Sequence, residues 1–250
     1  MTGAALLVLT LLSQAPAYYS PQEAQAVFAE GTQAWARQDV AGARAAWERL
    51  VSRGHSSQEV LYNAGTAALA AGDVGAAVLY LERALRAGGE TEDIEANLAV
   101  ARSRQLDQVV GAGLERGFAQ RLASATDARL CGWFALVGTW GACLLFALAR
   151  LRAGRTRSVA LALGALGLLL ALPACALVAT HAWVDRTVRE GVVMAATVPV
   201  RELPQVGARV AFELHAGLKL RLLDDKEGFV RVKLPNGLEG WAAREGIEPL

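Results

Sequence analysis

The spacing of hydrophobic and polar residues changes character several times along the chain. A short apolar run occupies residues 3–12, and residues 20–106 then carry apolar side chains at helical spacing. Two uncharged stretches follow, at 130–149 and 159–180, and beyond residue 191 apolar and polar residues alternate. This order predicts a multidomain chain with an all-α region, an apolar helical hairpin and a small all-β region.

Residues 1–17 have the features of a secretory signal peptide. The apolar run is too short to cross a bilayer, and Ala15-Pro16-Ala17 offers small residues for cleavage. An uncleaved N-terminal anchor is the alternative, because no Lys or Arg precedes the run.

Helix-start signals recur through residues 20–106. Ser20-Pro21-Gln22-Glu23 is a capping box with proline at the first helical position. Ser56 and Glu59 repeat the box spacing, and Asp39 and Asp73 are expected to cap two further helices. We therefore expect several short helices separated by tight turns.

The helical region repeats itself every 34 residues. This offset aligns Gly31 with Gly65 and Trp47 with Leu81. The second unit, 61–84, resembles a tetratricopeptide (TPR) repeat through Leu61-Tyr62-Asn63-Ala64-Gly65, Ala71-Gly72-Asp73, Ala77, Leu81 and Ala84. A third unit begins at Thr91. The resemblance implies TPR repeats with a capping helix over 20–122.

The uncharged stretches 130–149 and 159–180 are predicted to be transmembrane helices. Each is as long as a bilayer crossing requires and is apolar all round, which does not suit a buried helix pair of a soluble protein. Small residues should allow the two helices to pack closely, and these are Gly138, Gly141, Gly164 and Gly167.

A basic loop, 150–157, joins the two predicted spans. It holds Arg150, Arg152, Arg155 and Arg157 and no acidic residue. The positive-inside rule predicts that this loop is cytoplasmic, so both flanks of the hairpin face the other side. A patch for anionic lipid or nucleic acid is the alternative interpretation.

Residues 191–250 are predicted to form strands. Residues 218–222 and 229–234 alternate, with turns at 224–228 and at Pro235-Asn236-Gly237. The lysines of the chain are expected at exposed strand positions, and they are Lys219, Lys226 and Lys233. The segment resembles a bacterial SH3 barrel through residues 198–201, 214–220, 228–232 and Gly237-Leu238-Glu239-Gly240-Trp241.

Few residues suit catalysis or metal binding. Cys131, Cys143 and Cys175 lie in or at the ends of the apolar stretches, and His55, His181 and His215 are scattered. None has the spacing of metal ligands or of a catalytic motif, so we expect neither an enzyme nor a cofactor or metal. His215 is expected in an exposed loop. The net charge of +1 disfavours a nucleic-acid partner.

The TPR resemblance implies a peptide-binding face on the first helix of each pair. Its candidate residues are Tyr62, Asn63, Thr66 and Asn97, since asparagine amides can bond an extended peptide backbone. Phe28, Thr32, Trp35 and Leu69 also match this face, although helical spacing equally allows Phe28, Trp35 and Leu69 to be core. The region has no lysine, which disfavours capture of a C-terminal carboxylate.

The order of signal, TPR repeats, two spans and SH3-like barrel resembles the BatE-type proteins of the aerotolerance (Bat) operons. Tyr62-Asn63-Ala64-Gly65 and the 214–219 stretch fit this resemblance. It implies an inner-membrane scaffold with both modules in the periplasm, and von Willebrand-type Bat membrane proteins as partners. Peptidoglycan binding or envelope sensing through the barrel is the alternative function.

Overall fold

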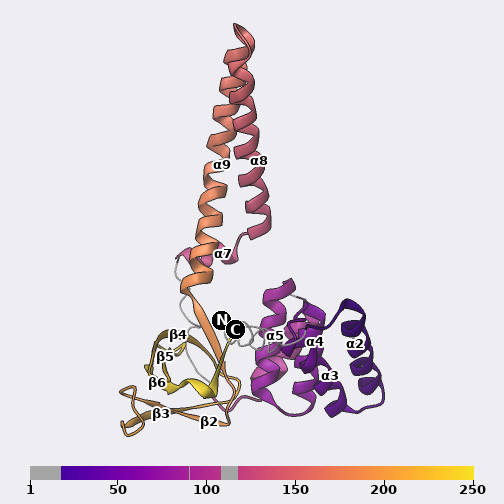
Figure 1. Cartoon of the computed structure of the whole chain (residues 1–250). Helices are drawn as coiled ribbons and strands as arrows, with labels where there is room; N and C mark the ends of the chain where they lie inside the picture. Colours follow the sequence, from indigo (N-terminus) through magenta and orange to yellow (C-terminus); the bar gives the residue numbers. More distant parts are fainter. Residues whose placement is uncertain (1–17, 90, 108–117) are drawn as a thin grey trace, which may run out of the picture. The chain divides into compact units, whose positions relative to one another are not determined.

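In the described part of the chain, five helices and a seven-stranded sheet form one compact unit, and a long helical hairpin dominates a second (Figure 1). The computed structural model describes residues 18–89, 91–107 and 118–250. The predicted signal peptide, 1–17, and part of the predicted capping helix, 108–117, lie outside these residues. The coarse prediction of helices, two apolar spans and a small antiparallel β region is confirmed.

Three of the five helices described in the first unit begin at their expected caps. Ser20 forms both bonds of its capping box, and Asp39 and Asp73 each accept a hydrogen bond from the third residue after them. The predicted box at Ser56 is wrong, because Ser57 is the cap and accepts from the Val60 amide. The helices are α2 (Pro21–Ala36), α3 (Val40–Ser52), α4 (Gln58–Ala70), α5 (Val74–Gly88) and α6 (Glu92–Ser103).

Two glycines let successive helices approach each other closely. A Cβ added to Gly65 would lie 2.7 Å from Leu81 Cγ, and one added to Gly31 would lie 2.6 Å from Trp47 Nε1. The 34-residue offset maps the first of these contacts onto the second, because it aligns Gly31 with Gly65 and Trp47 with Leu81. The large residue of each second helix therefore fills the space beside the glycine of the first, so α2–α3 and α4–α5 repeat one packing arrangement.

The seven strands form an antiparallel sheet in the order β3-β2-β6-β5-β4-β1-β7. The predicted alternation is confirmed in its core, where Leu220, Leu222, Val230 and Val232 are buried. The strands are β1 (Arg189–Val193), β2 (Thr197–Arg201), β3 (Val210–His215), β4 (Lys219–Lys226), β5 (Phe229–Lys233), β6 (Glu239–Ala243) and β7 (Ile247–Pro249), with a short 3-10 helix, η1 (Arg244–Gly246), before β7.

The turn expected at 224–228 is shorter than predicted. Strand β4 continues through Lys226, and only Glu227 and Gly228, both at positive φ, link it to β5. Asp224 pairs with Arg231 across the hairpin after a bulge, so its polar side chain occupies an exposed strand position. Asp224 and Asp225 therefore lie in the exposed end of strand β4 and not in a turn.

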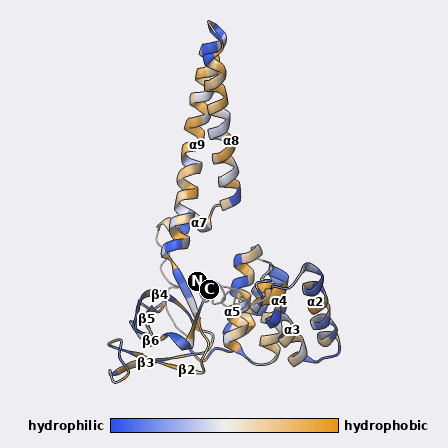
Figure 2. Cartoon of the chain, viewed as in Figure 1, coloured by the Kyte–Doolittle hydropathy of each residue, from blue (hydrophilic) through white to orange (hydrophobic). Residues whose placement is uncertain are grey.

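The second unit contains α7 (Phe118–Ser124), α8 (Ala128–Arg150) and α9 (Arg155–Thr187). Helices α8 and α9 are long and apolar enough to cross a membrane, and Figure 2 shows apolar residues along both and polar ones at their turn. A Cβ on Gly138 would lie 2.8 Å from that of Ala171. The expected role of Gly141 is wrong, because a Cβ there meets nothing within 4 Å.

Candidate functional site

The predicted peptide-binding residues lie on helices α4 and α6 of the first unit. All four, Tyr62, Asn63, Thr66 and Asn97, are half-buried. The Asn97 amide donates to Thr66 Oγ1 at 2.9 Å and to the Tyr62 hydroxyl at 3.4 Å. The structure thus brings three of them together, and their hydrogen bonds link α6 to α4 of the second helix pair.

Asn63 differs from the other three predicted residues. Within the described part of the chain its side chain has no hydrogen-bond partner. An asparagine amide offers both donors and an acceptor, which is the pair of functions needed to bond the backbone of an extended peptide. Asn63 is therefore the predicted residue best suited to a direct ligand contact.

Two adjoining pockets lie beside this polar face. The first, of about 170 Å³, is lined by Gln58, Glu59, Tyr62, Thr91, Asp93 and Ile94. The second, of about 480 Å³, is lined by Ala24, Gln25, Phe28, Leu50, Gly54, His55, Ser56, Ser57, Glu59 and Val60. Glu59 belongs to both, and the described lining residues include carboxylates but no Lys or Arg. This surface suits a neutral or basic ligand.

The other residues that matched the face divide between surface and core. Leu69 is buried in the helical core, which agrees with the core alternative for this residue. Phe28 is half-buried and packs against the core of the first helix pair, whereas Thr32 is exposed. Trp35 is 38% exposed, with its ring centroid 6.1 Å from that of Trp47.

The sheet covers an outer face of the helices, a feature that the sequence patterns did not reveal. Val192 of β1 is fully buried in the helical core cluster, and Met194 and Leu250 pack against the same cluster. Gly75 of α5 allows this contact, because a Cβ there would lie 3.2 Å from the Val193 carbonyl oxygen. We call this contact the helix–sheet interface.

Charged groups border the helix–sheet interface. The buried Glu82 carboxylate of α5 accepts from Lys219 at 2.9 Å and from Arg102 at 2.7 Å. Lys219 also lies 3.1 Å from Glu190, which pairs with Arg86 at 2.6 Å. Burial acts to raise the pKa of Glu82, but the charge and hydrogen bond of Lys219, with Arg102, outweigh it and lower that pKa.

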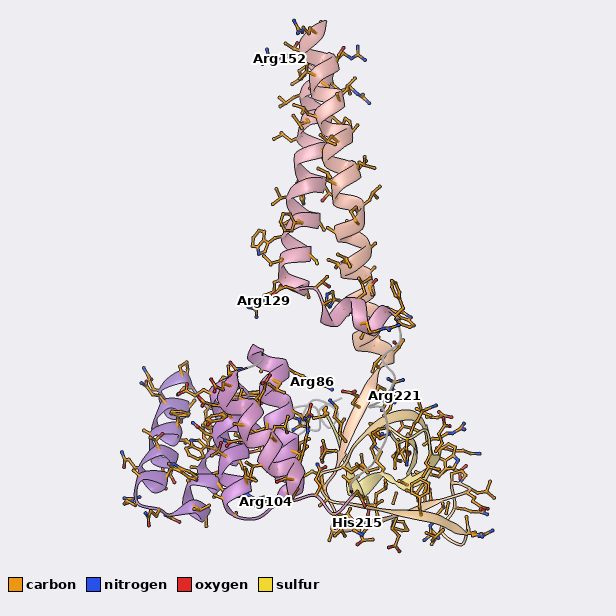
Figure 3. The ribbon with its side chains drawn as sticks, turned by 180° about the vertical axis from the view of Figure 1, so that it is seen from behind. Arg86, Arg104, Arg129, Arg152, His215 and Arg221 are labelled. Atoms are coloured by element: carbon orange, nitrogen blue, oxygen red, sulfur yellow. The ribbon has the colours of Figure 1, made fainter. Side chains whose placement is uncertain are left out.

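A second polar group lies at the edge of the same interface. The Asp107 carboxylate accepts from the His215 amide at 2.6 Å and lies 2.8 Å from His215 Nδ1. Gln105 donates to the Gly217 carbonyl at 2.5 Å. The expectation of an exposed loop position for His215 (labelled in Figure 3) is therefore wrong, because the residue ends β3 and is half-buried. Lys219, which was expected at an exposed strand position, is half-buried and pairs with Glu82.

One sequence signal could have indicated this interface. Glu82 lies four residues after Val78, on the same face of α5, and Val78 is fully buried. A carboxylate on an apolar helical face requires cationic partners when it is buried. The spacing alone could not identify Lys219, which lies 137 residues further along the chain.

The four loop arginines lie at the turn between α8 and α9, and all are exposed. Arg150 and Arg157 line a pocket of about 330 Å³ with Phe146, Ala149 and Leu161. In the described part of the chain, none of Arg150, Arg152, Arg155 and Arg157 forms an ion pair.

The cysteines belong to the hairpin. All three, Cys131, Cys143 and Cys175, are free thiols on α8 and α9. Among the residues described, no three His, Cys, Asp or Glu side chains are grouped so that they could hold a metal ion.

No protein-family model matches the chain, and no curated protein matches it.

Proposed function

We propose that the chain is a non-enzymatic membrane scaffold that binds an extended segment of a partner protein. The polar face of α4 and α6 with its two adjoining pockets carries this proposal, above all the unbonded Asn63 amide. The 34-residue period and the glycine-to-large-residue packing are typical of TPR repeats, which use such faces for peptides.

The chemistry of the face limits the kind of partner. Glu59 and Asp93 line the first pocket beside the Tyr62 ring. Carboxylates next to an aromatic ring favour a cationic side chain over an anionic one. The partner segment is therefore neutral or basic and contacts Asn63 through its backbone.

The membrane placement forms the second part of the proposal. Helices α8 and α9 anchor the chain in the bacterial inner membrane, and the four loop arginines keep their turn in the cytoplasm. The helical repeats and the SH3-like sheet then lie in the periplasm. The resemblance to BatE-type proteins supports this setting and suggests von Willebrand-type membrane proteins as partners.

The decisive experiment is recovery of membrane partners by the full chain in mild detergent. Asn63→Ala should reduce partner recovery about tenfold, because it removes a backbone-binding amide without disturbing the Asn97 bonds. Gln33→Ala, an exposed amide of α2, is the control and should recover partners normally. Equal recovery by all three proteins would refute the peptide-binding face.

A second candidate function is binding of the cell wall by the sheet. Leu203, Val206 and Leu238 lie in loops of the β region and are 55%, 79% and 50% exposed, so they offer apolar surface to a ligand. The full chain should sediment with purified peptidoglycan sacculi, and Leu203→Ser with Val206→Ser should abolish sedimentation. Sedimentation unaffected by these changes would exclude this surface.

A further inference from the structure

The pocket at the turn of the helical hairpin has an amphipathic lining. Arg150 and Phe146 lie four residues apart on α8, and Arg157 and Leu161 lie four residues apart on α9. Residues at this spacing share one helical face, one turn apart. Because the helices are antiparallel, both arginines lie toward the turn, and both apolar side chains lie one turn further from it.

The length of α8 puts the arginines at the level of lipid headgroups. Arg129 and Arg150 lie near its two ends, about 31 Å apart at 1.5 Å per residue, which matches a hydrocarbon core of about 30 Å. In Figure 3, Arg129 lies at one end of this helix and Arg152 lies just beyond its other end. Phe146 and Leu161 then lie at the depth of the upper acyl chains.

The charge at this end of the hairpin is uncompensated. The loop adds Arg152 and Arg155 to the two pocket arginines, and within the described residues none of the four has an acidic partner. Guanidinium groups bind phosphate through two parallel hydrogen bonds, which makes arginine more suitable than lysine for this purpose.

We propose that this pocket binds the headgroup of an anionic phospholipid, with the phosphate between Arg150 and Arg157 and the acyl chains along Phe146 and Leu161. A volume of about 330 Å³ is at the lower end of the range of small-ligand pockets, sufficient for a phosphoglycerol headgroup. The inference rests on the membrane placement proposed above and is independent of the scaffold role.

Phosphatidylglycerol is the probe, and phosphatidylcholine is the neutral control. The full chain in detergent micelles is titrated with each lipid, and bound lipid is counted by native mass spectrometry. In micelles the loop is accessible from all sides, so lipid binding does not depend on which side of a membrane the loop faces. Arg150→Gln with Arg157→Gln should lower phosphatidylglycerol binding about tenfold, since two charge-assisted contacts are lost.

The matched control is Arg152→Gln with Arg155→Gln, which removes the same charge from the same loop but outside the pocket. It should keep most of the bound phosphatidylglycerol. Equal losses in the two double variants, or equal binding of both lipids, would overturn the proposal. Displacement of the lipid by millimolar inorganic phosphate would also overturn it in favour of a free-anion site. Partner recovery by these variants tests the scaffold separately.

Discussion

Glu82 shows how a single charged residue can link two parts of a chain. Its carboxylate is buried on α5 and bonds Arg102 of α6 and Lys219 of β4. Removing one partner of a buried ion pair leaves the other charges uncompensated. Glu82→Gln should therefore lower the free energy of unfolding by about 1–3 kcal/mol, measured by thermal or chemical unfolding in detergent. Glu95→Gln, an exposed acid of α6, is the control and should change it little.

The same residue predicts a dependence on pH. The pKa of folded Glu82 lies below its ordinary value of 4.5. Its contribution to stability is therefore fully present above that value and is lost as the pH falls through the folded-state pKa. The wild-type protein should lose more stability than Glu82→Gln between pH 7 and pH values below 4.5. Parallel pH profiles of the two proteins would contradict this assignment.

Gln38 and Gly72 occupy equivalent turns of the two helix pairs. Both have positive φ, 62° and 80°, which is unfavourable for residues other than glycine. Gln38→Gly should raise the free energy of unfolding by up to about 1 kcal/mol, and Gly72→Ala should lower it by a similar amount. Changes of the same sign in both variants would show that these turns are not equivalent.

At the scale of the element, the packing of the hairpin distinguishes glycines that lie three residues apart. Gly138 faces Ala171 of α9, whereas nothing lies within 4 Å of a Cβ on Gly141. Gly138→Leu should separate the helices and lower hairpin stability by about 1–3 kcal/mol. Gly141→Leu should have little effect. Unfolding in a denaturing detergent series would measure both, and equal effects would contradict the packing.

The elements themselves could be predicted from local signals. The caps Ser20, Asp39 and Asp73, and the alternation in β4 and β5, depend only on neighbouring residues, and all are present in the structure. The prediction of Ser56 as a helix cap is wrong because the neighbouring Ser57 takes that position. Two adjacent hydroxyl residues offer equally good caps, and only the position of the helix decides between them.

The parts of the site that depend on distant residues could not be predicted. The bonds from Asn97 to Thr66 and from Lys219 to Glu82 join residues 31 and 137 positions apart. The 34-residue spacing aligns Asn97 with Asn63 of α4, but it does not predict the hydrogen bond from Asn97 to Thr66. No periodicity relates the sheet to α5. The alternation in β4 therefore predicts an exposed strand position for Lys219 and gives no sign of its bond to Glu82.

At the scale of the whole molecule, the helix–sheet interface makes the repeats dependent on the sheet. Val192, Met194 and Leu250 cover apolar surface of the helical core. A chain ending at residue 187 should therefore expose this surface and become more sensitive to limited proteolysis within α5 and α6. The intact chain with Leu203→Ser, an exposed loop change, is the control. Equal digestion of the wild type, the truncated chain and the Leu203→Ser variant would show that the helices are stable without the sheet.

The interface also sets the order in which the protein can mature during its synthesis. Val192 of β1 lies 89 residues beyond Ser103, the end of α6, so it emerges from the ribosome about 4–18 s later at roughly 5–20 residues per second. In the proposed membrane setting, both apolar helices would enter the bilayer during that interval, while α5 still exposes the surface that Val192 covers. The newly made helices α2–α6 would then need a chaperone to cover their exposed apolar surface. Because β1 follows the two apolar helices in the chain, this surface would be covered only after both helices had been inserted.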